Sequence, residues 1–266
     1  MGIDEHGFLG EEIKSIKLDI SKRYEKHFKF IREFNNFLNT LKFKLTPSSE
    51  DSREVAIAVL FTKGLETFQA VYILCSNGLT IDAQTLNRSL FEIMVTTLFC
   101  AKGEDEYKKY LAKDALNRIK WINSALKHSG EFPEELFKRE KSLIEMKGEY
   151  EAILRQLRNQ DVKKEVSIET MAREVELAHL YHIFYRIVCE DVHSNPRSLE
   201  KYISLDEKER ITILWGPRID EIDVHLAVAS EFMLIICKCL LDIFGEPKEE
   251  EIKFLSQQKE KIWKLT

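Results

Sequence analysis

Apolar residues recur at intervals of three and four along nearly the whole chain, which predicts a succession of amphipathic α-helices. Glycine, proline and asparagine interrupt this pattern at positions typical of helix ends. The expected helices cover residues 11–44, 51–77, 80–102, 105–127, 133–159, 168–192 and 219–244, followed by a last helix towards the C-terminus. Between residues 199 and 217 the pattern changes, and we expect either a small hairpin or an irregular insertion there. The chain is therefore expected to be an all-α antiparallel bundle of about eight helices.

The apolar pattern also predicts which helices are buried. The second half of the helix at 80–102 is apolar on every side, so this helix is expected at the centre, with the helix at 219–244 as its partner. The helices at 11–44 and 133–159 carry narrow apolar stripes and dense charge, which predicts outer positions. Because the expected loops are short, we expect a single domain in which an N-terminal helix (residues 1–50) packs on the main bundle (51–266).

Composition narrows the class of protein. Ten glycines and five prolines among 266 residues argue against sandwiches and barrels, and a net charge of −5 excludes a polycationic coat protein without excluding a local basic site. All five cysteines lie in apolar helical patterns, which indicates reduced, buried thiols. The longest clean apolar run, residues 232–237, is far shorter than the roughly 20 residues that span a bilayer. We expect a cytoplasmic protein without a membrane segment or a signal peptide.

One charged pair lies where charge is not expected. Arg88 and Glu92 are one helical turn apart, and their face of the central helix continues with the apolar Val95 and Phe99. Because burying two ions costs several kcal/mol each, the pair needs a specific role. It is either a structural brace between helices or a site in which Arg88 meets a phosphate or a carboxylate.

A second polar set lies on the helix at 168–192. Five side chains share one sector of the helical wheel: His179, His182, Arg186, Glu190 and His193. A solvated face usually collects lysine and glutamate, whereas this one holds three of the seven histidines and no lysine. The stripe is either a solvent-facing surface or an acid–base and anion-binding site.

Metal and cofactor chemistry find little support in the sequence. Two Glu-x-x-His elements, at Glu176–His179 and Glu190–His193, match the pattern of carboxylate-bridged di-metal bundles. Both lie on the same expected helix, about 21 Å apart, so they cannot form one shared site. No glycine-rich phosphate loop, dinucleotide fingerprint or serine nucleophile motif is present. We expect no metal and no cofactor.

Two family resemblances add to this reading. Arg186 and His193, followed by Ser194-Asn195-Pro196, resemble the Arg-x(4–6)-His signature of the HEPN superfamily, which comprises helical bundles that are often metal-independent ribonucleases of toxin–antitoxin or antiphage systems. That resemblance implies that Arg186 holds the scissile phosphate and that His193 handles protons during attack by the RNA 2′-hydroxyl. More broadly, the run from Leu86 to Glu92 and the later Tyr185…His193-Ser-Asn-Pro resemble an uncharacterised bacterial helical family (DUF5677-like) over about residues 55–241.

The two polar sets can be joined in one site. If the histidine stripe turns towards the central helix, one crevice would hold Arg88, Glu92, His182, Arg186, Glu190 and His193. Such a crevice favours RNA or another phosphate-bearing ligand, with Arg186 and His193 as catalytic residues and the others binding substrate. An antitoxin or defence partner is expected with it, and a homodimer through the outer stripe that includes Ile252 and Trp263. The rival hypothesis is a non-enzymatic binding or regulatory module.

Overall fold

The computed structural model describes residue 3 and residues 5–128, 140–158, 166–192, 196–206 and 208–264. The helices are α1 (Ile13–Arg23), α2 (Glu25–Lys42), α3 (Ser52–Ser76), α4 (Thr80–Ala101), α5 (Glu104–Lys127), α7 (Glu140–Arg158), α8 (Ile168–Glu174), α9 (Ala178–Leu180), α10 (Arg186–Val192), α11 (Pro196–Leu199), α12 (Ile222–Phe244) and α13 (Glu249–Trp263). A π-helical turn (Tyr181–Tyr185) joins α9 to α10, and short 3₁₀ turns occupy Gly7–Leu9 and Glu200–Tyr202. Two short strands, β1 (Ile203–Leu205) and β2 (Ile211–Ile213), form a hairpin. The expected all-α class is confirmed.

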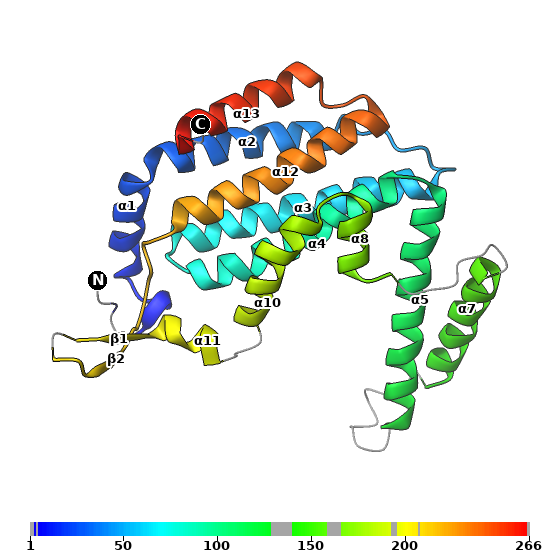
Figure 1. The fold of residues 1–266 in the computed structure, drawn as a ribbon, viewed down its shortest axis with the longest axis horizontal. Helices are drawn as coiled ribbons and strands as arrows, with labels where there is room; N and C mark the ends of the chain where they lie inside the picture. The colour runs from blue at the N-terminus through cyan, green and yellow to red at the C-terminus, as the bar shows by residue number, and fades with distance from the viewer. Residues whose placement is uncertain are drawn as a thin grey trace.

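The central position of α4 is confirmed. Its second half is buried on every side, with Leu90, Phe91, Met94, Val95 and Phe99 all fully inaccessible to solvent. It contacts α3 and α12 along its length, and α5, α8 and α10 at its other faces. Figure 1 shows α3, α4 and α12 running alongside one another through the body of the molecule. An all-round apolar helix is most stable in this position because every face then contacts other side chains.

The first expected helix is divided in two. Tyr24 leaves helical geometry (φ −112°, ψ 27°), so that α1 and α2 run in different directions in Figure 1. The Tyr24 hydroxyl donates a hydrogen bond to the carbonyl oxygen of Ile219 at 2.6 Å, which holds the bend against the start of α12. The prediction of one continuous helix over 11–44 is wrong here, because a contact with a distant segment favours the bend.

The C-terminal helix α13 covers α2. Ile252 and Leu255 are buried within the chain, and the Trp263 ring packs edge-on against His27 and Phe30 at centroid distances of 4.8 and 5.6 Å. The stripe that we expected to bury against a second subunit therefore packs mainly on the chain's own core.

Two helices form an arm that projects from the body (Figure 1). α7 packs along α5 through a small apolar cluster of its own, to which Ala112, Ala115, Leu154 and Leu157 belong. Arg118 on α5 donates a hydrogen bond to the Tyr150 hydroxyl on α7 at 3.0 Å. The arm therefore has contacts of its own besides the main core.

The segment that the sequence left open is a hairpin. Ile203 pairs with Ile213 and Leu205 with Ile211, so these four side chains lie on one face, whereas Ser204 and Thr212 lie on the other. The apolar face is uncovered within the chain, since the four residues are 45–73% exposed. Figure 1 shows the hairpin at the opposite end of the molecule from the arm.

Two helices, α3 and α12, are long and apolar enough to cross a membrane by length and composition alone. In α12, 61% of the apolar window is buried inside the fold, and in α3 the fraction is 33%. Core helices of folded proteins have the same composition, because their side chains must exclude water on several faces.

Candidate functional site

The segment that carries the histidine stripe is not one continuous helix. α8 ends where Glu176 adopts a left-handed conformation (φ 63°), and the Leu177 backbone N–H then donates to the Ala172 carbonyl at 2.7 Å, as in a Schellman motif. The π-helical turn follows at Tyr181–Tyr185. The prediction of a single helix over 168–192 is therefore wrong. Glutamate rarely occupies the left-handed position, so this break could not be predicted from the residue types.

The π-helical turn rotates the residues that follow it. Such a turn accommodates an extra residue, which shifts the buried face relative to an ideal helical wheel. An ideal helical wheel of residues 168–192 places Ile187 on the apolar side opposite the polar stripe and leaves Tyr185 off it. In the structure Tyr185 and Val188 are buried (8% and 2% exposed), whereas Ile187 is 46% exposed. The wheel therefore missed Tyr185 as an inward-facing residue.

Arg88 and Glu92 of α4 meet the inner face of this segment. The Arg88 guanidinium lies 3.0 Å from a Glu92 carboxylate oxygen and donates hydrogen bonds to the Tyr185 hydroxyl and the Cys189 Sγ, each at 3.1 Å. The Tyr185 hydroxyl in turn donates to Glu92 at 2.7 Å. This closed network joins α4 to the π-helical turn and to α10, an arrangement typical of a structural brace.

The network changes the proton affinity of its members. Burial raises the pKa of Tyr185, and its hydrogen bond to the Glu92 carboxylate raises it further. Burial acts to lower the pKa of Arg88, but the hydrogen bonds to Tyr185 and Cys189 and the charge of Glu92 outweigh it and raise that pKa. Arg88 and Tyr185 therefore stay protonated, Arg88 as a cation and Tyr185 as a neutral hydrogen-bond donor.

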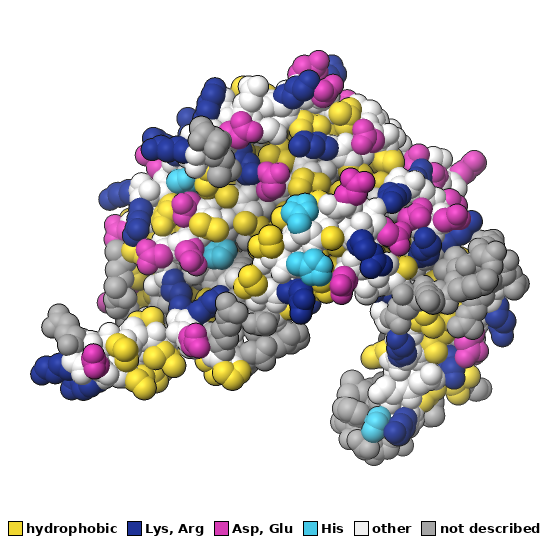
Figure 2. Space-filling model, viewed as in Figure 1, with side chains coloured by type: hydrophobic (Ala, Val, Ile, Leu, Met, Phe, Trp, Pro, Cys, Tyr) yellow, Lys and Arg dark blue, Asp and Glu magenta, His cyan; other side chains and the backbone are white. Residues whose placement is uncertain are grey.

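The outer face of the same segment carries the predicted stripe. His179, His182 and Arg186 are exposed, and Figure 2 shows histidine and basic side chains on the surface over α9 and α10. The prediction that this stripe turns inward to share a crevice with Arg88 and Glu92 is wrong for these three residues. The physical reason is that the aromatic side of this segment packs on α4, where Phe184 and Tyr185 contact Phe91, and the polar stripe is left to solvent. His193 and the Glu190 side chain lie outside the described residues.

A hollow of about 500 Å³ opens beside the brace, where the arm joins the body. It is lined by Lys113 of α5, by residues 166–169 at the start of α8, and by Tyr181 and Tyr185. The two tyrosine rings stack with centroids 5.1 Å apart and an interplanar angle of 24°. Figure 2 shows the molecule hollowed between the arm and the body. The hollow therefore combines aromatic surface with a basic and a hydroxyl side chain.

Tyr181 links this hollow to the exposed stripe. Its ring contacts that of His182 edge-on at 5.4 Å. Burial and the nearby Glu169 carboxylate raise the pKa of Tyr181, while the charge of Arg186 acts to lower it. Tyr181 thus lines the hollow and also contacts His182 of the exposed stripe.

Sequence reasoning missed four residues of this region: Lys113, Tyr181, Tyr185 and Cys189. The last three follow one another at intervals of four residues, which is a signal for a shared helical face. Lys113 belongs to a charged outer helix and carried no such signal. The structure brings together Arg88 and Glu92 as one pair, and His182 and Arg186 on a separate surface.

One histidine outside the stripe is buried in the core. His225 of α12 is buried (8% exposed), burial lowers its pKa, and its backbone carbonyl accepts a hydrogen bond from the Asn87 side chain at 3.1 Å. Among the residues that the structure describes, no three His, Cys, Asp or Glu side chains lie close enough together to hold a metal ion.

Comparison with known proteins gives one match. Residues 54–210 match the model of a family described as a family of unknown function (DUF5677). The match begins in α3 and ends at the hairpin, so it contains the brace, the hollow and the exposed stripe. No curated protein and no solved structure matches the chain.

Proposed function

The chain belongs to the DUF5677 family, whose function is unknown, and we propose that it binds RNA and cleaves it without a metal ion. The observation that carries the proposal is the position of Arg186. Its side chain is exposed, and its charge acts on Tyr181, which lines the hollow together with Tyr185 and Lys113. Guanidinium groups bind phosphate oxygens in two-pronged geometry, and single-stranded RNA is bound by stacking its bases on aromatic rings.

Each part of the surface has a role in this proposal. Arg186 holds the scissile phosphate, and the RNA 2′-hydroxyl attacks that phosphate. His193 accepts the hydroxyl proton or returns a proton to the leaving 5′-oxygen, as the resemblance to HEPN ribonucleases implies. His182 binds the neighbouring backbone, and Glu190 is assigned to the same substrate surface. Arg88 and Glu92 position the turn that carries Arg186.

A second candidate function is a non-enzymatic helical binding or regulatory module. It is favoured by the brace itself, because Arg88, Glu92 and Tyr185 pair with one another and leave no charge of the pair unmatched. In that case the exposed stripe is solvated surface or binds a partner protein.

The cellular setting is part of the proposal. We propose a cytoplasmic protein that acts with an antitoxin or another partner of a toxin–antitoxin or antiphage system. A homodimer is proposed as well, and it is supported by the uncovered apolar face of the hairpin, since isolated sheets bury such a face against another element. Light scattering on the purified protein would then give twice the chain mass of 31.2 kDa.

RNA cleavage by the purified protein in the presence of EDTA tests the activity. Arg186→Ala and His193→Ala are each expected to lower the rate by about 100-fold or more, in line with the loss of a phosphate-binding group or a general acid or base. Arg173→Ala is the matched control, because Arg173 is an exposed arginine of α8 that lies outside the predicted stripe. Cleavage that survives both substitutions, or that is absent from the wild type, would contradict the ribonuclease proposal.

A further inference from the structure

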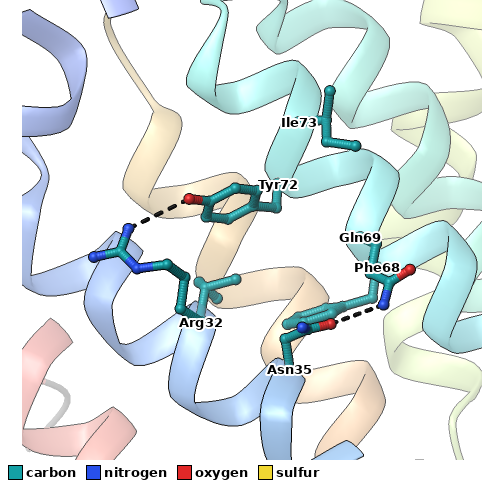
Figure 3. Close-up of a pocket in the computed structure, with 7 residues that line it drawn as sticks. Arg32, Asn35, Phe68, Gln69, Tyr72 and Ile73 are labelled. Carbon is teal, nitrogen blue, oxygen red and sulfur yellow. Dashed lines mark hydrogen bonds between the residues drawn. The ribbon is translucent and has the colours of Figure 1, made fainter. Parts of the chain in front are cut away.

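A second cavity lies between α2 and α3 and shares no lining residue with the hollow at the arm (Figure 3). Its volume is about 270 Å³, and the apolar side chains of Ile31 and Phe68, each 1% exposed, close its inner side. Tyr72 and Ile73 of α3 form further parts of the lining. The volume corresponds to about nine water molecules at liquid density, so it fits a ligand of about ten non-hydrogen atoms.

One end of the cavity carries a cation without an acidic partner. Arg32 of α2 is exposed, and among the described residues no carboxylate lies within 4.0 Å of its guanidinium. It donates one hydrogen bond, from Nη1 to the Tyr72 hydroxyl at 3.3 Å (Figure 3). The Tyr72 ring is itself fixed by an edge-on contact with Phe28 at 5.3 Å. Since a guanidinium has five N–H donors, most of them remain for a bound anion.

The other end carries a pair of side-chain amides. Gln69 Nε2 donates to Asn35 Oδ1 at 2.9 Å, and Asn39 Nδ2 donates to the same oxygen at 3.2 Å. Two donors on this oxygen fix the orientation of the Asn35 amide, so its NH₂ group faces away from Gln69, as Figure 3 shows. The cavity therefore presents N–H donors above an apolar floor.

We propose that this cavity binds a small aromatic carboxylate. The carboxylate pairs with the Arg32 guanidinium, the ring lies on Phe68 and Ile31 beside Tyr72, and the Asn35 NH₂ group donates to an acceptor on the ligand. A pocket with apolar lining and a few converging polar groups is typical of small-molecule sites, and a cation with free donors selects an anionic group. This site is independent of the proposed action on RNA.

Binding of benzoate, phenylacetate and indole-3-acetate to the full chain tests the proposal, with nuclear magnetic resonance of the ¹⁵N-labelled protein as the measurement. At least one of the three acids is expected to bind saturably and to shift the side-chain NH₂ signals of Asn35 and Gln69. Arg32→Gln should weaken that binding by about tenfold or more, since a charge-assisted contact is lost. Lys29→Gln is the matched control, because it removes one exposed positive charge from α2 and Lys29 does not line the cavity.

The neutral amide of the bound acid separates charge recognition from simple apolar binding. Phenylacetamide, for example, should bind more weakly than phenylacetate by about tenfold or more. The proposal is overturned if none of the three acids binds saturably, if Arg32→Gln leaves the affinity unchanged, or if acid and amide bind equally. Because Arg32 is exposed, its replacement should leave the fold intact, and an unchanged spectrum away from the cavity verifies this.

Discussion

The two faces of the segment from Tyr181 to Val192 differ in the surroundings of the charged groups they contact or carry. On the inner face, Tyr185 and Cys189 join the charges of Arg88 and Glu92 in a closed network. On the outer face, His182 and Arg186 are exposed, and no described carboxylate lies within ion-pair distance of Arg186. Both sets are candidate site residues in the sequence, but only the outer set is accessible to a ligand. Charge on an apolar helix face therefore indicates function only when the fold leaves it without a protein partner.

Removal of the inner cation should have the largest effect on stability. Arg88→Ala removes the donor to the Tyr185 hydroxyl and the cation that pairs with the partly buried Glu92, so the free energy of unfolding is expected to fall by about 2–3 kcal/mol. Urea denaturation followed by circular dichroism measures this loss. A change below about 0.5 kcal/mol would show that the network is not a brace.

Loss of the tyrosine hydroxyl should have an intermediate effect. Tyr185→Phe keeps the ring but removes the hydrogen bonds to Arg88 and Glu92, which is expected to cost about 1 kcal/mol. Tyr202→Phe serves as the control in the same denaturation experiment, because Tyr202 is 43% exposed and distant in the sequence from the brace. Equal losses in the two variants would mean that the Tyr185 hydroxyl contributes nothing specific.

Buried and exposed histidines should also differ, in their contribution to the pH dependence of stability, and this effect is expected to be smaller. Burial lowers the pKa of His225 below its ordinary value of 6.5, so the unfolded chain binds a proton more readily than the folded one. Stability should therefore decrease as the pH falls through about 6.5. His225→Gln should reduce this decrease between pH 7.5 and 5.5, whereas His179→Gln, at an exposed position, should not. Identical pH profiles for the wild type and the His225 variant would contradict the assignment.

The smallest effect is expected on the outer face. Arg186→Ala removes an exposed side chain and should change the free energy of unfolding by no more than about 0.5 kcal/mol. The same urea denaturation provides the value. A loss as large as that of Arg88→Ala would mean that Arg186 belongs to the structural network.

The sequence could predict the parts of the fold that depend on local pattern. The all-round apolar half of α4 indicated a central helix, and the spacing of Arg88 and Glu92 indicated that the pair needs partners. Three features were not predictable from the pattern: the left-handed Glu176, and the bend at Tyr24 and the π-helical turn, which both make contacts with distant segments. The turn decides which side chains face α4, because it brings Tyr185 to Arg88. A helical wheel assumes a constant rotation per residue, so it could not predict this arrangement.

The central claim is that Arg88 and Glu92 stabilise the fold, whereas the exposed Arg186 is proposed to bind RNA for cleavage. Its most direct test measures the RNA cleavage rate of Arg186→Ala at a temperature where the unfolding transition shows that the protein is fully folded. We expect a loss of about 100-fold or more in rate with an unchanged unfolding transition. A wild-type rate in a stably folded Arg186→Ala protein would contradict the claim.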